Sequence, residues 1–358
     1  MTAAARLPGG RTLAGWGLTL AVGALGGGLF TWLGAPLPWM LGAVCATAGA
    51  ALAGAPLVPP EPLRQAVVPL LGLMIGGSFT PALVHEAPHW AASLAGMAVY
   101  TVAATALVYA AFRRVAGMDP VTAYFAAAPG GLTAMILTGR AMGGDERIIS
   151  LVHVLRIVFV VLTIPVGYQL LSAYDGASAT RVMGSVADLR PAGLAVLVAA
   201  AVAGILAGRL MRLPTPGLTG PMLLFGALHV AGITMVRPPA EVVLVGQLVM
   251  GATVGARFAG LSRLALAVTA GRGLLATALM LALAGAASLL LAAATGLDAG
   301  ALMLAFAPGG LVEMSLISLA MDIDPAFVAV HHMLRIILVV LGAPLVFRLL
   351  GFTTARRQ

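Results

Sequence analysis

The sequence predicts an all-α polytopic membrane protein made of two related halves. Of its 358 residues, 61% are hydrophobic and only 9% are charged, whereas a soluble domain carries about 25% charged residues. Apolar runs of about 20 residues, each long enough to cross a ~30 Å hydrocarbon core, recur along the whole chain. Residues 119–171 also align with residues 298–350 without a gap, with 22 identities in 53 positions.

The charge pattern also favours a membrane protein. The formal net charge is +8 and the sequence contains arginine but no lysine. Most of the arginines lie between apolar runs, as expected for cytoplasmic loops rather than for a nucleic-acid surface. The single cysteine, Cys45, excludes an intrachain disulfide. The first apolar stretch, 13–33, is longer than a signal-peptide core, so we expect it to be a retained membrane span.

Each half reads as six apolar segments. In the first half they are 13–33, 38–55, 64–79, 89–112, 119–141 and 147–171. In the second half they are 191–211, 216–236, 241–257, 268–293, 298–320 and 326–350. The predicted domains are therefore a first repeat over 1–171, an external linker over 172–190, a second repeat over 191–350 and a cytoplasmic tail over 351–358.

Arginines in equivalent loops indicate that the halves have inverted topology. The loop with Arg113 and Arg114 has a counterpart at 295–297 without a basic residue, and other loops show the reverse. Inversion requires that one segment per half enters and leaves the membrane on the same side. The fifth segment is the candidate, because a Pro-Gly-Gly sequence interrupts it. We predict ten spans plus two re-entrant hairpins, an elevator-transporter-like plan with both termini in the cytoplasm.

Two buried His–Arg pairs are the main candidate site residues. Arg156 and Arg335 each lie about 16 Å into a helix, near the bilayer midplane, where an arginine costs several kcal/mol and usually faces a cavity or a partner. His153 and His332 lie one turn earlier on the same helix face. One interpretation is an anion site at the midplane. The alternative is that each arginine only binds hairpin carbonyl groups, and the two roles can coexist.

The hairpin tips supply the other candidate solute-binding groups. Broken helices expose amide groups that favour anions, and interrupted segments in two inverted halves are the usual sign of a transporter binding site. Glu313 is the one carboxylate in either hairpin beyond its cap, and it could balance Arg335 or carry a coupling proton. The remaining predicted solute-binding residues are Pro129, Gly130, Gly131, Thr133, Pro308, Gly309, Gly310 and Ser315.

Four aspartates are expected to have a structural role only. Asp119, Asp145, Asp298 and Asp324 each precede an apolar segment, which is the position of a helix N-cap. The six histidines form no specific metal pattern, and no phosphate-binding loop, CxxC pair or Ser-His-Asp set is present. We therefore expect no metal, no cofactor, no catalytic residue and no enzyme activity.

The paired Pro-Gly-Gly-Leu hairpins, each followed by an Asp and a His-x-x-Arg, resemble the bacterial membrane family called AbrB, which is described as a membrane protein duplication. The segment from Pro36 to Gly42, echoed at Pro214 to Gly220, carries the same resemblance. Members are labelled as ammonia monooxygenases or as transcriptional regulators of the AbrB type. The resemblance covers essentially the whole chain and implies a bacterial inner-membrane protein.

The leading functional prediction is a secondary transporter that moves a small anionic or zwitterionic organic solute by alternating access. Since no ATP-binding motif is present, a gradient of H⁺ or Na⁺ would drive it. The first alternative is a membrane regulator or sensor that acts indirectly on gene expression, and the second is a copper-dependent monooxygenase. We expect contact with the lipid bilayer and none with nucleic acid. The sequence does not decide whether the chain forms a homodimer.

Overall fold

The computed structural model describes residues 10–171, 184–261 and 263–349. These residues are helical apart from turns and one isolated bridge between Gly184 and Pro239, and they contain no strand. By their internal packing they fall into two compact units. One unit comprises Met1–Val67 and Leu244–Arg263, and the other comprises Val68–Val243 and Leu264–Gln358.

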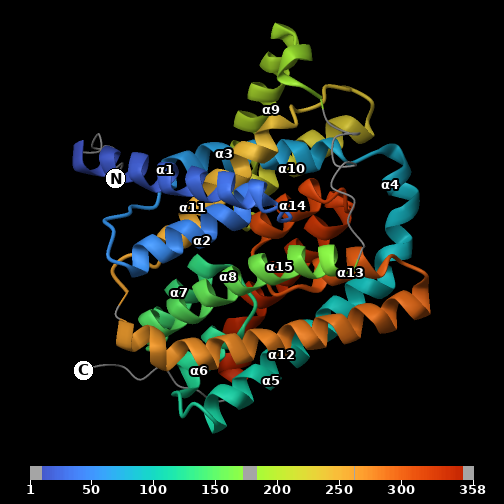
Figure 1. The fold of residues 1–358 in the computed structure, drawn as a ribbon. Helices are drawn as coiled ribbons and strands as arrows, with labels where there is room; N and C mark the ends of the chain where they lie inside the picture. Colours follow the sequence, from blue (N-terminus) through green and yellow to red (C-terminus); the bar gives the residue numbers. More distant parts are fainter. Residues whose placement is uncertain (1–9, 172–183, 262, 350–358) are drawn as a thin grey trace. The chain divides into compact units, whose positions relative to one another are not determined.

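The helices follow the predicted apolar segments (Figure 1). The helices of the first half are α1 (Gly10–Trp32), α2 (Pro38–Leu52), α3 (Glu61–Gly77), α4 (Pro81–Glu86), η1 (Ala87–Trp90), α5 (Ala91–Arg114), α6 (Pro120–Ala127), α7 (Leu132–Ala141) and α8 (Glu146–Leu170). The remaining helices are η2 (Val186–Asp188), α9 (Pro191–Leu210), α10 (Pro216–Val230), α11 (Glu241–Ala256), α12 (Arg263–Thr295), α13 (Ala299–Phe306), α14 (Leu311–Ala320) and α15 (Pro325–Leu349).

Six helical segments within the described residues are long and apolar enough to cross a membrane. They are Thr12–Trp32, Ala87–Arg114, Glu146–Leu170, Pro191–Leu210, Thr269–Thr295 and Pro325–Gly342. The helices Pro38–Leu52, Glu241–Ala256 and Leu311–Ala320 are apolar but shorter. The chain is thus an all-helical polytopic membrane protein, as predicted, and the finer plan of ten spans with two re-entrant hairpins stays a prediction.

Glycines bring helices into backbone contact within the unit that contains α1, α2 and most of α11. A Cβ at Gly26 would lie 2.2 Å from the carbonyl oxygen of Gly42, and a Cβ at Gly42 would lie 2.2 Å from that of Gly26. On α11, a Cβ at Gly251 would lie 2.6 Å from the oxygen of Met40. Such close approach is typical of helix packing in lipid. There the hydrophobic effect does not drive helices together, and small residues allow close van der Waals contact instead.

The other unit repeats this arrangement with α9, α10 and α3. A Cβ at Gly220 would lie 2.0 Å from the carbonyl oxygen of Gly204. On α3, a Cβ at Gly72 would lie 2.4 Å from the oxygen of Leu218, and one at Gly76 would lie 2.6 Å from that of Met222. In each unit, therefore, the third helix of one half packs on the first helix pair of the other half.

Equivalent helices also begin in the same way. Leu37 precedes α2 and Thr215 precedes α10, and both adopt left-handed backbone geometry, with φ of 44° and 50°. Each is followed by a proline at the first helical position, which is suited to a helix start. The resemblance between the segments at Pro36 and Pro214 therefore extends to their backbone conformation.

The linker and tail predicted from the sequence are only partly described. Within the linker, residues 172–183 lie outside the described residues, as does the tail 351–358. The described end of the linker lies against the start of α11, where Ser185 donates a hydrogen bond of 2.9 Å to Glu241. The inverted orientation of the halves and the domain boundaries stay predictions.

Candidate solute-binding site at two helical hairpins

Both predicted interruptions are present, and each divides a segment into two short helices. Ala127 ends α6 and Leu132 begins α7, while Phe306 ends α13 and Leu311 begins α14. In the first hairpin the start of the first arm lies beside the residues that follow the second arm. The hydroxyl of Thr122 there accepts a 2.8 Å hydrogen bond from the amide of Asp145. The Pro-Gly-Gly sequence therefore lies at the tip of a helical hairpin.

The four aspartates cap helices, as predicted. Asp119 accepts from the amide of Thr122 at the start of α6, at 2.9 Å, and Asp298 accepts from the amide of Ala301 at the start of α13, at 2.6 Å. Asp145 and Asp324 accept from first-turn amides of α8 and α15, at 2.8–3.2 Å. These bonds satisfy amides that otherwise lack a helical partner.

His153 and Arg156 of α8 bind the end of the first hairpin arm. Nε2 of His153 lies 2.8 Å from the carbonyl oxygen of Phe125, and Nδ1 accepts from Arg156 Nη2 at 2.7 Å. Arg156 Nη1 donates to the carbonyl of Ala128 at 3.3 Å. Because Nδ1 accepts, this network assigns the proton of a neutral ring to Nε2. The predicted shared helix face is confirmed.

The second half repeats these contacts on α15 and α13. His332 Nε2 lies 3.0 Å from the carbonyl oxygen of Leu304, and its Nδ1 accepts from Arg335 at 2.9 Å. Arg335 donates to the carbonyl of Ala307 at 2.5 Å and also to that of Gly309. The second arginine therefore binds one more tip carbonyl than the first does.

The proline at each tip explains the histidine contacts. In an unbroken helix, the carbonyl of Phe125 would accept from the amide of residue 129, but Pro129 has none. Pro308 stands in the same relation to Leu304. The ring N–H of each histidine takes the place of the missing amide, so the arginines and histidines do bind hairpin carbonyls, as the structural alternative requires.

Electrostatically, the two arginines are buried positive charges. Arg156 is 4% exposed and Arg335 is 1% exposed. Among the described residues, the ion pairs within 4.0 Å are those of Arg64, Arg140 and Arg257, so no carboxylate pairs with either buried arginine. The Nε atoms of Arg156 and Arg335 are buried without a hydrogen-bond partner in that same part of the chain.

Each hairpin contacts the helix that carries the His–Arg pair of the other sequence repeat. A Cβ at Gly130 would lie 2.8 Å from Val339 of α15, and α14 packs against α8. Arg335 lies within electrostatic range of Arg156, and Tyr100 of α5 lies within range of both. The structure therefore brings both His–Arg pairs and the first tip into one region.

Glu313 does not pair with Arg335. It is the third residue of α14, 8% exposed, and its carboxylate lies beside Gly310. Ser315 and Ser318 are fully buried, and Ser315 Oγ has no partner among the described residues. Thr133 on α7, by contrast, is exposed.

An apolar cavity of about 290 Å³ borders the first tip. It lies between α5, α6 and α15, and Ala128, whose carbonyl Arg156 binds, is part of its wall. Its lining residues are Ala98, Thr101, Val102, Thr105, Ala106, Tyr109, Tyr124, Ala128, Leu338, Val339, Gly342 and Val346.

One buried polar contact was not predicted. His331 Nε2 lies 2.9 Å from Ser93 Oγ, and its Nδ1 lies 2.8 Å from the carbonyl of Phe327. Its neighbour His332 contacts the carbonyl of Leu304 at the end of α13, so the two adjacent histidines face different sides of α15. No group of three or more potential metal ligands occurs among the described residues.

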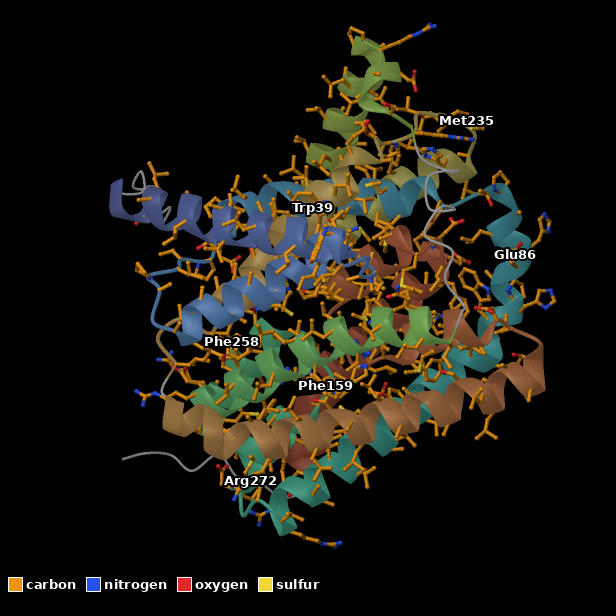
Figure 2. All side chains as sticks on the ribbon, in the orientation of Figure 1. Trp39, Glu86, Phe159, Met235, Phe258 and Arg272 are labelled. Atoms are coloured by element: carbon orange, nitrogen blue, oxygen red, sulfur yellow. The ribbon has the colours of Figure 1, made fainter. Side chains whose placement is uncertain are left out.

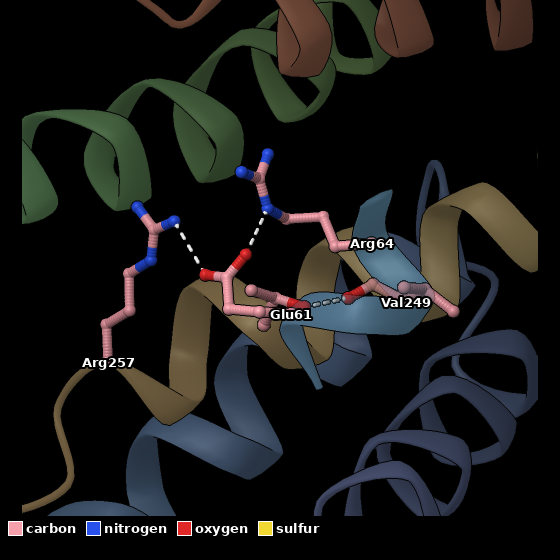
Figure 3. Close-up of polar contacts among 5 residues, drawn as sticks. Glu61, Arg64, Val249 and Arg257 are labelled. Atoms are coloured by element: carbon pink, nitrogen blue, oxygen red, sulfur yellow. Dashed lines mark hydrogen bonds and ion pairs between the residues drawn. The ribbon is translucent and has the colours of Figure 1, made fainter. Parts of the chain in front are cut away.

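A separate ion cluster lies at the start of α3 (Figure 3). Glu61 binds Nε of Arg64 at 2.7 Å and Nη2 of Arg257 at 3.4 Å. Partial burial of Glu61 works against ionisation, but the hydrogen bonds and charges of the two arginines lower its pKa below the usual 4.5. In the other unit, Arg272, labelled in Figure 2, donates to the carbonyl of Ala116 at 3.2 Å.

Comparison with known proteins agrees with the hairpin motifs. The family described as "Transition state regulatory protein AbrB" matches residues 39–351. The protein YhjN of Bacillus subtilis (strain 168) is 26% identical over 358 residues, covering 92% of each chain. The protein named "Putative regulator AbrB" of Escherichia coli (strain K12) is 24% identical over 347 residues, covering 96% of this chain and 98% of its own. No solved structure matches the chain.

Proposed function

The chain belongs to the AbrB family, and from that premise and the geometry of the two hairpins we propose that it is a secondary transporter for a small anionic or zwitterionic organic solute. A gradient of H⁺ or Na⁺ drives it, and it works by alternating access in a bacterial inner membrane with both termini in the cytoplasm. The predicted site residues are its solute-binding groups.

One observation carries the proposal, namely that the buried charge of Arg156 and Arg335 exceeds what the fold requires. The carbonyl left without an amide by each proline is already bound by a neutral histidine. At the first tip, a neutral side chain would suffice for the one remaining carbonyl, that of Ala128, at a much lower desolvation cost. Two buried guanidinium groups with unpaired Nε atoms therefore favour an anionic ligand.

The arrangement of the halves supports the alternating-access part of the proposal. The two hairpins have the same helix bounds at a constant offset of 179, as shown by Pro120–Ala127 against Ala299–Phe306. The third helices are exchanged between halves through matching glycine contacts. Two inverted, interlocked repeats with paired broken helices are the common plan of carriers that move a midplane site between two faces.

The test is uptake of radiolabelled carboxylates and amino acids into proteoliposomes under imposed H⁺ or Na⁺ gradients. We expect gradient-dependent uptake that Arg156→Gln and Arg335→Gln abolish. Arg140→Gln is the matched control, because Arg140 is an exposed arginine on α7 of the first hairpin, paired at 3.2 Å with Glu146. Folded protein that gives no uptake over the whole panel would exclude the transporter.

A membrane regulator is the second candidate, favoured by the name of the relative in Escherichia coli. Such a protein would act through a cytoplasmic partner. Arg114 lies in the last turn of α5, at the end of the helix that the proposed topology places in the cytoplasm. Co-purification of a cytoplasmic protein that Arg114→Glu abolishes, without solute uptake, would favour the regulator.

A further inference from the structure

We propose that a carboxylate group of the solute binds at the N-terminus of α7, in the space that Glu313 fills in the second hairpin. The inference rests on the proposed function and assigns a place to the anionic group of the solute. It follows from a difference between two hairpins that are otherwise built alike.

In the second hairpin a residue of the chain itself occupies the start of the second arm. A Cβ at Gly310 would lie 2.0 Å from Oε2 of Glu313, so the carboxylate lies directly against the glycine that precedes α14. A helix N-terminus favours negative charge because its first amides have no helical partner. At the second tip this place therefore holds a carboxyl group that belongs to the chain itself.

In the first hairpin the same place is open. Ala134 is the counterpart of Glu313, and a Cβ at Gly131 would have no neighbouring heavy atom within 4 Å. Gly131 is half-buried and Thr133 is exposed, whereas every residue of α14 is buried. The first amide bonded within α7 is that of Met135, which donates to Gly131 at 3.0 Å. The amides before it are free to bind a ligand.

Arg156 independently indicates an anion at this tip. Its Nη1 donates to Ala128, three residues before Gly131, and that 3.3 Å contact is its one tip carbonyl, whereas Arg335 binds two. The Nε of Arg156 is buried without a partner among the described residues. A carboxylate can accept from a guanidinium and from helix amides together. The Nε of Arg335 is unpartnered within that part of the chain as well, but at the second tip the start of the arm is already filled by Glu313.

Placing the missing carboxylate on the first hairpin tests the inference. Purified full-length wild type, Ala134→Glu and Ala134→Gln are compared by equilibrium binding of radiolabelled lactate, succinate and leucine. We expect Ala134→Glu to weaken binding about tenfold or more, because its charged carboxylate is attracted to the helix amides and repels the anionic ligand. Ala134→Gln has nearly the same size without the charge, so its affinity should stay within about threefold of the wild type.

The outcomes are separable. If wild type binds a probe and Ala134→Glu binds it equally well, the location is wrong while the transporter stands. Equal losses in Ala134→Glu and Ala134→Gln would mean that bulk is responsible, which also overturns the inference. Wild type that binds none of the probes overturns the inference together with the solute class. If Ala134→Glu fails to fold, Thr133→Glu introduces the charge one residue earlier and is judged by the same criteria.

Discussion

Replacing each buried arginine by glutamine should give unequal losses of stability, with Arg335→Gln the more harmful change. Both variants remove a positive charge that is almost fully buried. Glutamine is shorter and retains hydrogen-bonding groups, but it does not reach two separate carbonyls as a guanidinium fork does. The comparison is internal, because the two sites have the same sequence spacing and the same histidine neighbour.

The size of the difference follows from the contacts. Both arginines donate to their histidine neighbours. Of the tip carbonyls, Arg335 binds that of Ala307, at 2.5 Å, and that of Gly309, whereas Arg156 binds only that of Ala128, at 3.3 Å. A hydrogen bond from a charged donor contributes about 1.5–3 kcal/mol. Loss of two such bonds amounts to about 3–6 kcal/mol, and loss of one long bond to about 1–2 kcal/mol. The relief of desolvation is similar at both sites and cancels in the comparison.

The assay is thermal unfolding of the purified variants in detergent, without ligand, followed by the amount of protein that stays monodisperse after heating. We expect the midpoint to fall for both variants and to fall further for Arg335→Gln. A midpoint for Arg156→Gln equal to or below that of Arg335→Gln would show that the tip carbonyls do not set the stability of the hairpins.

Three further predictions concern packing, pH and topology. Gly42→Ala should destabilise strongly, because its Cβ would lie 2.2 Å from the oxygen of Gly26, while Gly49→Ala, with open space around it, should be neutral or slightly stabilising in the same thermal assay. Because the pKa of Glu61 is lowered in the folded protein, its stabilisation is present above its unfolded value and is lost as the pH falls through the folded value. Glu61→Gln should therefore remove part of the loss of stability in acid, at most about 1 kcal/mol for a part-exposed pair, as measured by unfolding midpoints against pH. In a background without the native cysteine, a cysteine in place of Arg114 should react with an impermeant thiol reagent from the cytoplasm only, and reaction from outside would reject the proposed orientation.

The local features of the fold were predictable from the sequence because they depend on neighbouring residues. The Pro-Gly-Gly interruption, for example, follows from the missing amide of Pro129 and predicts the gap between α6 and α7. The caps at Asp119 and Asp145 follow equally from residue type and position. The His–Arg spacing placed both side chains on one helix face, which the hydrogen bond between them confirms.

Contacts between distant segments were not predictable in the same way. The sequence shows which carbonyl loses its amide, but not that a histidine on another helix replaces it. The exchange of α3 and α11 depends on glycines whose partners lie in the other half, and a single helix carries no information about its partner. The contact between Ser93 and His331 has no counterpart in the first half, so the repeat gave no indication of it.

The duplication explains why so few positions need to differ for the two halves to take different roles. Both hairpins keep the proline, the histidine and the arginine, because each broken helix has the same unsatisfied carbonyls. The carboxylate at position 313 and the alanine at position 134 change only what lies at the start of the second arm. A tip with its own anion is complete without ligand and can serve as fixed structure, whereas a tip without one leaves its arginine and helix amides for an external anion. A single substitution in one repeat is therefore enough to make the two tips differ in what they offer an anion, and restoring the symmetry at position 134 should weaken binding about tenfold or more.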